Sequence, residues 1–377
     1  MRALILDPEH KTASVRETAK PQPGPGEALI RVHSIALNPV DALYVFNPIA
    51  TTARVVGADF AGTVVEPTTP ALKPGQRVAG FVQGANSFNE RPGAFAEYAV
   101  SPADLVWAVP DSMTFDQAAA VSLCALTAAQ ALFYRLGLPA PFEWVKKKTG
   151  QARDTFPDGL TFFVYGASTS VGLYAAQLLR LAAAANGIPL RLVGTASKKH
   201  FDMLKAAPYG YDALVDYRDP NWIEEARQAG GASGIGYGID CISEGETVKQ
   251  VLGVLGEGGK LAIIRSLAGG AWSSEGVNLN SVFYGAVWEG LGVEIDYQNM
   301  TVPATEDTRR FAVAFYRWLS SGTALEANPV RLMPGGLSRV VPDGFALLGS
   351  GSMDDRAEGR TEDWMRPISG EKLVYQV

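Results

Sequence analysis

Phe162-Phe163-Val164-Tyr165-Gly166-Ala167-Ser168-Thr169-Ser170-Val171-Gly172 is an apolar segment that enters a turn of Gly, Ser and Thr, and a helix-like segment, 173–185, follows it. A strand that passes through a tight turn into a helix presents backbone N–H groups and the positive end of the helix dipole, which suit a pyrophosphate. We therefore expect a bound dinucleotide. The middle glycines of the G-x-G-x-x-G pattern are replaced here by hydroxyl residues. The expected contacts come from Ser168, Thr169, Ser170 and Val171.

A second apolar strand, residues 190–196, ends in Ser197-Lys198-Lys199-His200. An NAD enzyme normally carries an acidic residue at this place for the ribose 2′-hydroxyl. A hydroxyl and two lysines favour a 2′-phosphate instead, so the sequence predicts NADPH rather than NADH, with contacts from Ser197 and Lys198. The alternative is a solvated Ser-Lys-Lys helix start with no ligand.

Length and composition indicate a large globular protein. The 377 residues are 47% apolar and 19% charged, enough to bury the cores of two domains. The net charge of −6 argues against a nucleic-acid surface, which needs clustered Lys and Arg. The one lysine run, Lys146-Lys147-Lys148, reads as part of a solvated loop.

Targeting signals are not evident in the sequence. Residues 1–6 read as a first strand, without the longer apolar region of a signal peptide. No purely apolar run approaches the roughly eighteen residues of a membrane span. The two cysteines, Cys124 and Cys241, stand apart in apolar segments and do not suggest a disulfide framework. We expect a cytoplasmic protein.

The order of apolar runs predicts two kinds of domain. Residues 1 to about 110 carry short β-like runs at 29–35, 62–65, 77–81 and 94–100, and a helical, alanine-rich stretch follows over 115–136. A polar stretch at 139–159 reads as an inserted loop. Strands at 160–166, 190–196, 213–216, 236–242 and 259–264 then alternate with helices at 170–185, 199–206, 221–229 and 246–255, which implies parallel βαβ units. The tail from about 328 returns to short strands.

Ordered landmarks make the chain resemble the medium-chain dehydrogenase/reductase superfamily along essentially its whole length. They are Asn38-Pro39-Val40-Asp41, Gly57-Ala58-Asp59, Gly62, 74–78, 93–98, Leu126-Thr127-Ala128, Asp216-Tyr217 and Ser369-Gly370-Glu371-Lys372-Leu373-Val374. The resemblance implies an α/β protein with two domains. A β-rich GroES-like catalytic domain would comprise 1–125 and 328–377, and a Rossmann-type parallel-sheet domain that binds NADPH would comprise 126–327.

Missing residues select the branch of that superfamily. Zinc alcohol dehydrogenases have a ligand cysteine where this chain has Asn38, and a Gly-His-Glu where it has Gly57-Ala58-Asp59. The three histidines, His10, His33 and His200, show no metal-ligand spacing, so we expect no metal. The chain is therefore similar to the quinone-oxidoreductase and enoyl-reductase branch.

Within this branch, the chain is most similar to the fungal trans-acting enoyl reductases of polyketide assembly, the lovastatin type. This similarity rests on Gly-Leu-Pro at 137–139, Gly-x-Ser-Thr at 166–169, Phe201-Asp202, Val215-Asp216-Tyr217-Arg218 and the C-terminal motif. One departure matters: those proteins carry a lysine where this chain has Leu43, so no role of that lysine transfers.

The resemblance implies NADPH-dependent reduction of an activated carbon–carbon double bond, with a polyketide enoyl thioester as the substrate. A quinone or free-enone reductase is the alternative among enzymes, and a non-catalytic nucleotide-binding partner of a synthase is the alternative of another class. An acyl carrier domain of a polyketide synthase is the expected partner, for which Lys146-Lys147-Lys148 could supply a docking charge. The chain would be a monomer or a homodimer.

Two residues are candidates for the chemistry. In conjugate reduction, negative charge develops on the carbonyl oxygen, so a nearby donor lowers the barrier. Thr127, expected at a helix start, could contact the nicotinamide or donate to that oxygen, or could only bond its own helix backbone. Tyr44 could give the proton to the α-carbon, although solvent could do so and a packing role is as plausible. We expect the substrate to contact Tyr44 and the segment Phe283-Tyr284-Gly285.

The remaining candidate residues are expected beside the cofactor. Asn38 and Asp41 would shape a pocket floor through loop hydrogen bonds, or form only an Asx turn ahead of Pro39. Tyr217 would stack or hydrogen-bond at the 2′-phosphate. Cys241 would be a small filler at the sheet edge rather than a nucleophile. The other predicted contacts are Ile264, Arg265, Ser369 and Lys372, of which Lys372 would reach a phosphate or ribose, or cap a strand in solvent.

Overall fold

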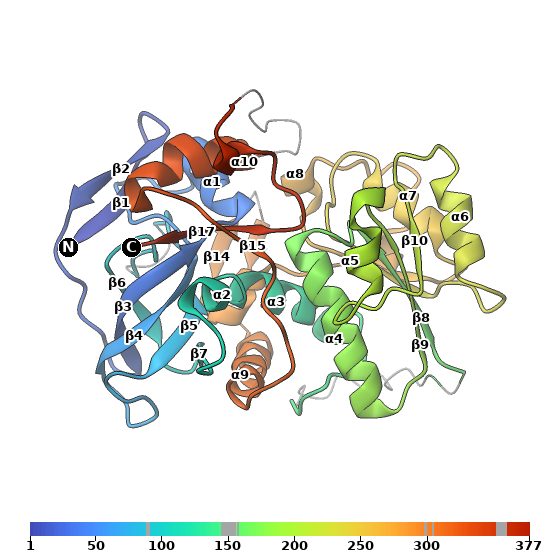
Figure 1. Ribbon diagram of the computed structural model, residues 1–377, viewed down its shortest axis with the longest axis horizontal. Helices are drawn as coiled ribbons and strands as arrows, with labels where there is room; N and C mark the ends of the chain where they lie inside the picture. Colours follow the sequence, from blue (N-terminus) through green and yellow to red (C-terminus); the bar gives the residue numbers. More distant parts are fainter. Residues whose placement is uncertain (88–90, 145–155, 157, 298–299, 304, 352–359) are drawn as a thin grey trace. The chain divides into compact units, whose positions relative to one another are not determined.

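The computed structural model describes residues 1–87, 91–144, 156, 158–297, 300–303, 305–351 and 360–377. The chain forms two compact units (Figure 1). Unit 1 comprises Met1–Leu123, Tyr316–Thr323 and Ala327–Val377, and unit 2 comprises Cys124–Phe315 and Ala324–Glu326. The predicted domain functions stay predictions: catalysis for residues 1–125 and 328–377, and NADPH binding for residues 126–327.

Unit 2 is built on a six-stranded sheet whose strands run in the order β10-β9-β8-β11-β12-β13 and pair in parallel. The predicted parallel βαβ architecture is confirmed. Helices of five or more residues follow four of the strands, and the shorter α8, Leu267–Gly270, follows β12, because the connections of a parallel sheet must cross from one of its ends to the other. The strands are β8 Leu160–Tyr165, β9 Leu190–Thr195, β10 Ala213–Val215, β11 Tyr237–Asp240, β12 Lys260–Ile263 and β13 Val282–Tyr284; the helices are α4 Ser170–Asn186, α5 Phe201–Lys205, α6 Trp222–Ala229 and α7 Thr247–Val254.

The core of unit 2 explains why these strands read as continuous apolar runs. Phe163 of β8, Val193 of the adjacent β9 and Leu261 of β12, which β11 separates from β8, are fully buried. They share one cluster with Trp222 of α6 and Val251 of α7, so side chains of the helices cover this face of the sheet. Strands buried on both faces lack the alternation of a half-exposed strand.

The predicted helix over 115–136 is wrong in its continuity. The structure has α2 Phe115–Ala119, α3 Ser122–Ala129 and then a π-helix, Gln130–Arg135. The side chain of Thr114 caps α2 by accepting the N–H of Gln117 at 3.2 Å, and α2 ends after one turn. The helix α9, Glu306–Ser320, lies in a part of the chain for which no element was predicted.

Unit 1 contains a seven-stranded sheet with the order β16-β17-β3-β4-β5-β7, and β6 pairs with β3. A hairpin of β1 and β2 forms a second, smaller sheet. The strand β17 pairs antiparallel with β3 and so joins the sheet of which β3 is the first strand in the chain (Figure 1). The strands are β1 Arg2–Asp7, β2 Thr12–Glu17, β3 Glu27–Ala36, β4 Asp59–Pro67, β5 Arg77–Phe81, β6 Tyr98–Pro102, β7 Val106–Ala108, β16 Val330–Leu332 and β17 Lys372–Gln376.

The segment after Asn38 is a helix, α1 Pro39–Phe46, rather than the expected loop. Pro39 stands at its first position, where a missing N–H costs nothing. Asp41 accepts the backbone N–H of Asn38 at 2.8 Å, which closes the first turn. The Asn-Pro-x-Asp pattern is a helix start, and this is the signal that the loop interpretation missed.

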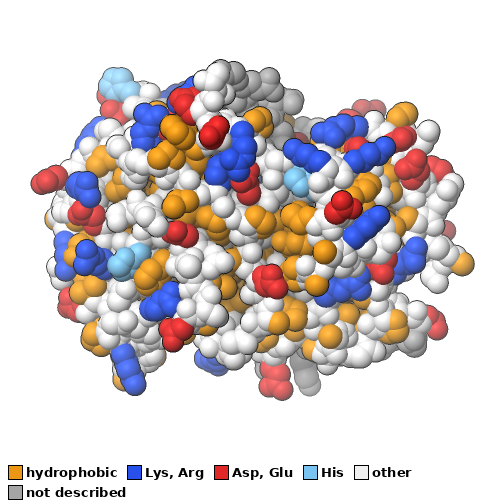
Figure 2. Space-filling view, viewed as in Figure 1, with side chains coloured by type: hydrophobic (Ala, Val, Ile, Leu, Met, Phe, Trp, Pro, Cys, Tyr) orange, Lys and Arg blue, Asp and Glu red, His pale blue; other side chains and the backbone are white. Residues whose placement is uncertain are grey.

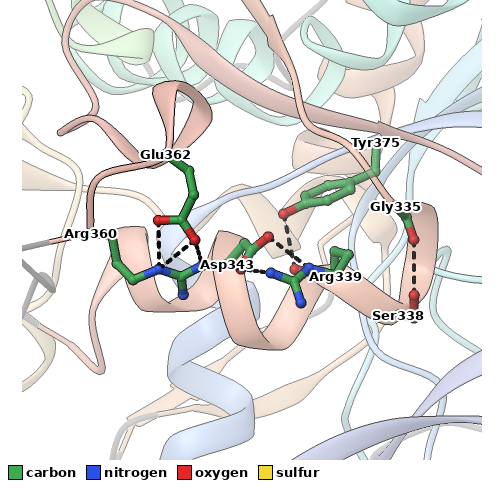
Figure 3. A network of polar contacts seen from close by, with 7 residues as sticks. All are labelled: Gly335, Ser338, Arg339, Asp343, Arg360, Glu362 and Tyr375. Atoms are coloured by element: carbon green, nitrogen blue, oxygen red, sulfur yellow. Dashed lines mark hydrogen bonds and ion pairs between the residues drawn. The ribbon is translucent and has the colours of Figure 1, made fainter.

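The tail is not made of short strands alone. Between β16 and β17 lie a 3-10 helix, Gly336–Arg339, a π-helix, Val340–Phe345, and α10, Ala346–Leu348. The fully buried Asp343 accepts hydrogen bonds from Arg339 at 2.8 and 2.6 Å and from Arg360 at 3.4 Å (Figure 3). The hydroxyl of Tyr375 donates to the carbonyl of Arg339 at 3.1 Å. These contacts tie the helical segment to β17.

Only the ends of the predicted insertion at 139–159 are described. Phe142 and Trp144 pack on Phe311 of α9, with ring centroids 5.7 and 4.9 Å apart. The run Lys146-Lys147-Lys148 lies outside the described residues, so its predicted docking role stays a prediction.

Candidate functional site

The turn from β8 into α4 is ordered by its hydroxyl residues. Thr169 is the N-cap of α4: its Oγ1 accepts the N–H of Gly172 at 3.1 Å and donates to the carbonyl of Gly166 at 2.8 Å. Gly166 has φ +75°, and its own N–H reaches Thr195 Oγ1 of β9 at 3.1 Å. The replacement of the middle glycines thus leaves a well-capped turn.

Gly172 shows why the last glycine of the turn is required. A Cβ at this position would lie 2.4 Å from the carbonyl oxygen of Gly166, so any larger residue would push the helix away from the turn. The seventeen-residue α4 directs its N-terminus at this edge of the sheet. At N2, the backbone N–H of Val171 has no carbonyl four residues back inside the helix, which is the arrangement that binds anions.

The ends of β9 and β10 bring the predicted 2′-phosphate residues to the same sheet edge. Thr195 and Val215 are paired in register, and the N–H of Ala196 reaches the carbonyl of Val215 at 3.1 Å. Ser197 and Tyr217 each follow two residues later, and Lys198 comes next to Ser197. Lys198 is exposed and Tyr217 is 41% exposed. No acidic residue directly follows β9.

At the end of β11, a buried carboxylate shapes the next turn. Asp240 is fully buried and accepts the N–H groups of Ile242 and Ser243, both at 2.9 Å, and the hydroxyl of Thr247 at 2.6 Å. Burial raises the pKa of Asp240 to about 6 despite these hydrogen bonds. Asp240 was not among the predicted site residues, although an acidic residue that ends an apolar strand is a signal for such a site.

Cys241 is buried beside this carboxylate. Burial and the neighbouring Asp240 hold the pKa of the Cys241 thiol well above its usual range, so the thiol stays protonated and is a poor nucleophile. A protonated, buried thiol agrees with the expected role of Cys241 as a small packing residue. The contact with a cofactor stays a prediction.

The end of β12 is joined to the end of β11. The Ser243 hydroxyl accepts the N–H of Ile264 at 3.1 Å and donates to the carbonyl of Asp240 at 2.8 Å. The guanidinium of Arg265 pairs with Glu244 and donates to the carbonyl of Gly269. Ile264 and Arg265 therefore belong to the same edge as Cys241, and their cofactor contacts stay predictions.

Unit 1 carries a buried polar cluster around Lys372. The Lys372 ammonium lies 2.7 Å from Asp59 Oδ2 and donates to Asn38 Oδ1 at 2.9 Å. Asn38 Nδ2 donates to Asp59 Oδ2 at 3.0 Å, and the N–H of Leu123 donates to Asp59 Oδ1 at 2.9 Å. Lys372 is only 3% exposed, so the alternative of a strand cap in solvent is wrong.

Asp41 completes this cluster on the side of α1. Its carboxylate accepts the backbone N–H of Asn38 at 2.8 Å and is 3% exposed. Burial first, and then the negative charge of Asp59, raise the pKa of Asp41 to about 7, although its bond to Asn38 and the positive charge of Lys372 act in the opposite direction. The predicted cofactor contacts of Asn38, Asp41 and Lys372 stay predictions.

The two candidate catalytic residues belong to different units. Tyr44 lies on α1 in unit 1, is 3% exposed, and accepts a hydrogen bond from Gln83 Nε2 at 3.4 Å. Thr127 lies inside α3 in unit 2 and not at a helix start, since α3 begins at Ser122. Their roles stay predictions.

The predicted substrate segment forms the edge strand of the unit 2 sheet. Phe283 and Tyr284 lie in β13, next to β12. A Cβ on Gly285 would approach Arg135 Nε to 2.5 Å, so a glycine leaves room for that side chain. Ser369 precedes β17 in unit 1 and is partly buried. Their contacts with ligands stay predictions.

Three further properties bear on the class of protein. Within the described residues, no three His, Cys, Asp or Glu side chains are grouped so that they could hold a metal ion. The same part of the chain contains no helix that is long and apolar enough to span a bilayer. Lys and Arg side chains are interspersed with Asp and Glu over the face drawn in Figure 2, unlike a basic nucleic-acid surface.

Two protein families match the chain: the alcohol dehydrogenase GroES-like domain over residues 24–111, and the zinc-binding dehydrogenase over residues 170–284. A trans-enoyl reductase of Penicillium crustosum is 32% identical over 391 residues, covering 100% of this chain and 96% of the relative. A trans-enoyl reductase of Aspergillus niger is 38% identical over 262 residues, 68% of each protein. The crystal structure of CurK enoyl reductase has a TM-score of 0.71 at 18% identity, covering 100% of this chain and 98% of that one, which speaks for the fold.

Proposed function

Because the chain belongs to the trans-enoyl reductases of the medium-chain dehydrogenase/reductase superfamily, we propose that it reduces the double bond of a polyketide enoyl thioester with NADPH. The observation that carries the proposal is the full-length likeness to a trans-enoyl reductase. An acyl carrier domain of a polyketide synthase would present the substrate.

The edge of the unit 2 sheet suits the proposed cofactor. The turn capped by Thr169 offers backbone N–H groups at the start of α4 for the pyrophosphate. Ser197, Lys198 and Tyr217 lie at the ends of β9 and β10, where the adenosine ribose of a dinucleotide belongs. An exposed lysine with no acidic residue after β9 favours a 2′-phosphate, so NADPH is preferred over NADH.

When bound, NADPH supplies the hydride for the β-carbon of the enoyl group. Residues of this chain then have two tasks. The Thr127 hydroxyl would donate to the carbonyl oxygen as negative charge develops there, or would hold the nicotinamide. Tyr44, whose hydroxyl is oriented by Gln83, would give a proton to the α-carbon.

Turnover of matched substrates tests the proposal. The full chain is mixed with NADPH and either an enoyl thioester of pantetheine, the corresponding free enone, or a quinone, and NADPH oxidation is followed. We expect the highest kcat/KM with the thioester. A higher value with the quinone or free enone would favour a reductase that needs no carrier, and oxidation with none of them would favour a non-catalytic partner of a synthase.

A matched pair of variants separates the catalytic roles. Thr127→Val removes the hydroxyl at nearly constant volume, and loss of one donor to a developing oxyanion costs on the order of a hundredfold in kcat. Thr161→Val, in strand β8 of the same unit, is the control. An unchanged kcat in the Thr127 variant would contradict the donor role without touching the assignment of substrate.

A further inference from the structure

We propose that Arg218 is a specificity-determining residue for NADPH, which fixes the ring of Tyr217 and adds a second positive charge beside the 2′-phosphate. This inference rests on the NADPH preference of the proposed function. It adds Arg218 to the predicted 2′-phosphate site of Ser197, Lys198 and Tyr217.

The guanidinium of Arg218 stacks on Tyr217. Its central carbon lies 5.0 Å from the centroid of the tyrosine ring, within the range of a cation–π contact. The backbone N–H of Arg218 donates to Asp216 Oδ1 at 3.1 Å, and that of Asp219 donates to the carbonyl of Asp216 at 2.9 Å. The tight turn after β10 therefore holds the pair next to the residues that follow β9.

The charge of Arg218 is available to a ligand. Its one close carboxylate is Asp216, at 4.0 Å from Nη1, and within the described part of the chain its guanidinium donates no hydrogen bond. Other arginines of unit 2 differ: Arg180 donates to Asp212 and Gly210, and Arg265 to Glu244 and Gly269. The Arg218 side chain is 59% exposed, so its donors face solvent.

Lys198 supplies the other charge, from the 3-10 turn that follows the neighbouring strand β9. It is exposed, and in the described residues its ammonium has no ion pair. A phosphate monoester carries close to two negative charges at neutral pH, so two cations match it better than one. A guanidinium also offers two parallel N–H groups to phosphate oxygens, which an ammonium cannot. Figure 2 shows Lys and Arg side chains close to the part of unit 2 that contains α5.

Lys199 is the matched control. It is exposed like Lys198 but comes one position later in the 3-10 turn Lys198–His200. With about three residues per turn, its side chain leaves the helix axis roughly 120° away from that of Lys198. The Lys199→Gln variant removes one positive charge from the same neighbourhood without removing either proposed phosphate ligand.

Equilibrium binding to the full chain tests the inference. Dissociation constants are measured by calorimetry for NADPH, NADH and 2′,5′-ADP, a probe with the phosphate but no nicotinamide. For Arg218→Gln we expect roughly tenfold weaker binding of NADPH and 2′,5′-ADP, the loss of one charge-assisted contact, and less than about twofold change for NADH. Arg218→Lys, which keeps the charge but not the stacked plane, should lose about threefold.

The outcomes separate the two proposals. If the unsubstituted protein binds NADPH and NADH equally, the NADPH preference is overturned, and the role of Arg218 with it. If it prefers NADPH but Arg218→Gln loses no more affinity than Lys199→Gln, only the role of Arg218 is overturned. A loss of equal size for NADH would also overturn it, because a contact with the 2′-phosphate cannot act on a cofactor that lacks one.

Discussion

Lys372 in unit 1 and Lys198 in unit 2 were both expected at phosphates or ribose, yet their surroundings are opposite. Lys372 is buried between Asp59 and Asn38, with its ammonium 2.7 Å from the carboxylate. Lys198 stands exposed at the end of β9. Both sequence motifs contain a lysine. Only the fold decides whether the ammonium forms an ion pair inside the protein or stays exposed, where it can bind a ligand.

The comparison predicts different consequences for the two lysines. A buried ion pair makes the protein intolerant of losing one partner, because the other charge is left without compensation. An exposed cation adds little to folding and acts mainly on a charged ligand. Stability should therefore depend on Lys372, and the choice between NADPH and NADH should depend on Lys198.

The largest expected effect is that of Lys372→Met on stability. Removal of the ammonium leaves Asp59 charged and buried, which costs about 3–5 kcal/mol in the free energy of unfolding. Urea unfolding measures the loss, and Lys73→Met, at an exposed position of unit 1, is the control. The double variant Asp59→Asn, Lys372→Met should recover part of the loss. Equal unfolding of Lys372→Met and the control would contradict the buried-pair account.

The affinities for NADPH and NADH give a second way to distinguish Lys372 from Lys198. If Lys372 also reaches a phosphate or ribose, that group is common to NADPH and NADH, so Lys372→Met should change both affinities by the same factor. A change in the ratio of the two dissociation constants would place Lys372 at the 2′-phosphate and would contradict its role as a buried ion-pair partner of Asp59.

Lys198→Ala should weaken the binding of NADPH and leave the stability of the protein unchanged. Loss of a charge-assisted phosphate contact removes on the order of 1.5–3 kcal/mol, so NADPH should bind roughly tenfold to a hundredfold more weakly, with NADH nearly unchanged. Its unfolding free energy should match that of Lys199→Ala. Titrations of both cofactors measure the effect, and an unchanged NADPH affinity would remove Lys198 from the site.

Asp41 adds a pH dependence to the buried cluster. Its pKa is about 7 in the folded protein, against 3.8 as the ordinary value, so the folded state holds the proton more tightly. The resulting stability is fully present below about pH 4 and is lost as pH rises towards 7. Between about pH 5 and pH 8, the unfolding free energy of Asp41→Asn should fall less than that of the unsubstituted protein, by on the order of 2–3 kcal/mol. Identical pH slopes would contradict this.

The smallest expected effect is that of chelation. We predict that prolonged treatment with a chelator changes neither the melting temperature nor turnover, because neither folding energy nor Lewis-acid chemistry depends on zinc. Stoichiometric zinc in the purified protein, with activity lost when it is removed, would contradict the prediction.

Most of the unit 2 sheet could be predicted because its signals are local. Apolar runs bounded by Gly, Ser and Pro gave β8, β9 and β11 close to their observed bounds, and the turn after β8 identified the start of α4. The helix α1 was missed because Asn38 and Asp41 were assigned to a loop, although Pro39 is a typical first helical residue. The break between α2 and α3 and the π-helix after it depend on tertiary contacts rather than on local pattern.

Some contacts of the candidate site could also be predicted from the sequence, and others could not. Ser197 and Tyr217 could be brought together because parallel strands end at one sheet edge. The pairing of Lys372 with Asp59 joins residues 313 positions apart, which no local pattern reports. The stacking of Arg218 on Tyr217 joins neighbours, yet periodicity cannot indicate which way two exposed side chains turn.

The most direct measurement follows the hydride itself. The full chain is incubated with an enoyl pantetheine thioester and NADPH that carries deuterium at the transferred position of nicotinamide C4, and the product is analysed by mass spectrometry and NMR. The account predicts a saturated thioester with one deuterium at its β-carbon and a solvent-derived proton at its α-carbon. An unreduced thioester, or a saturated product without deuterium at the β-carbon, would contradict the account.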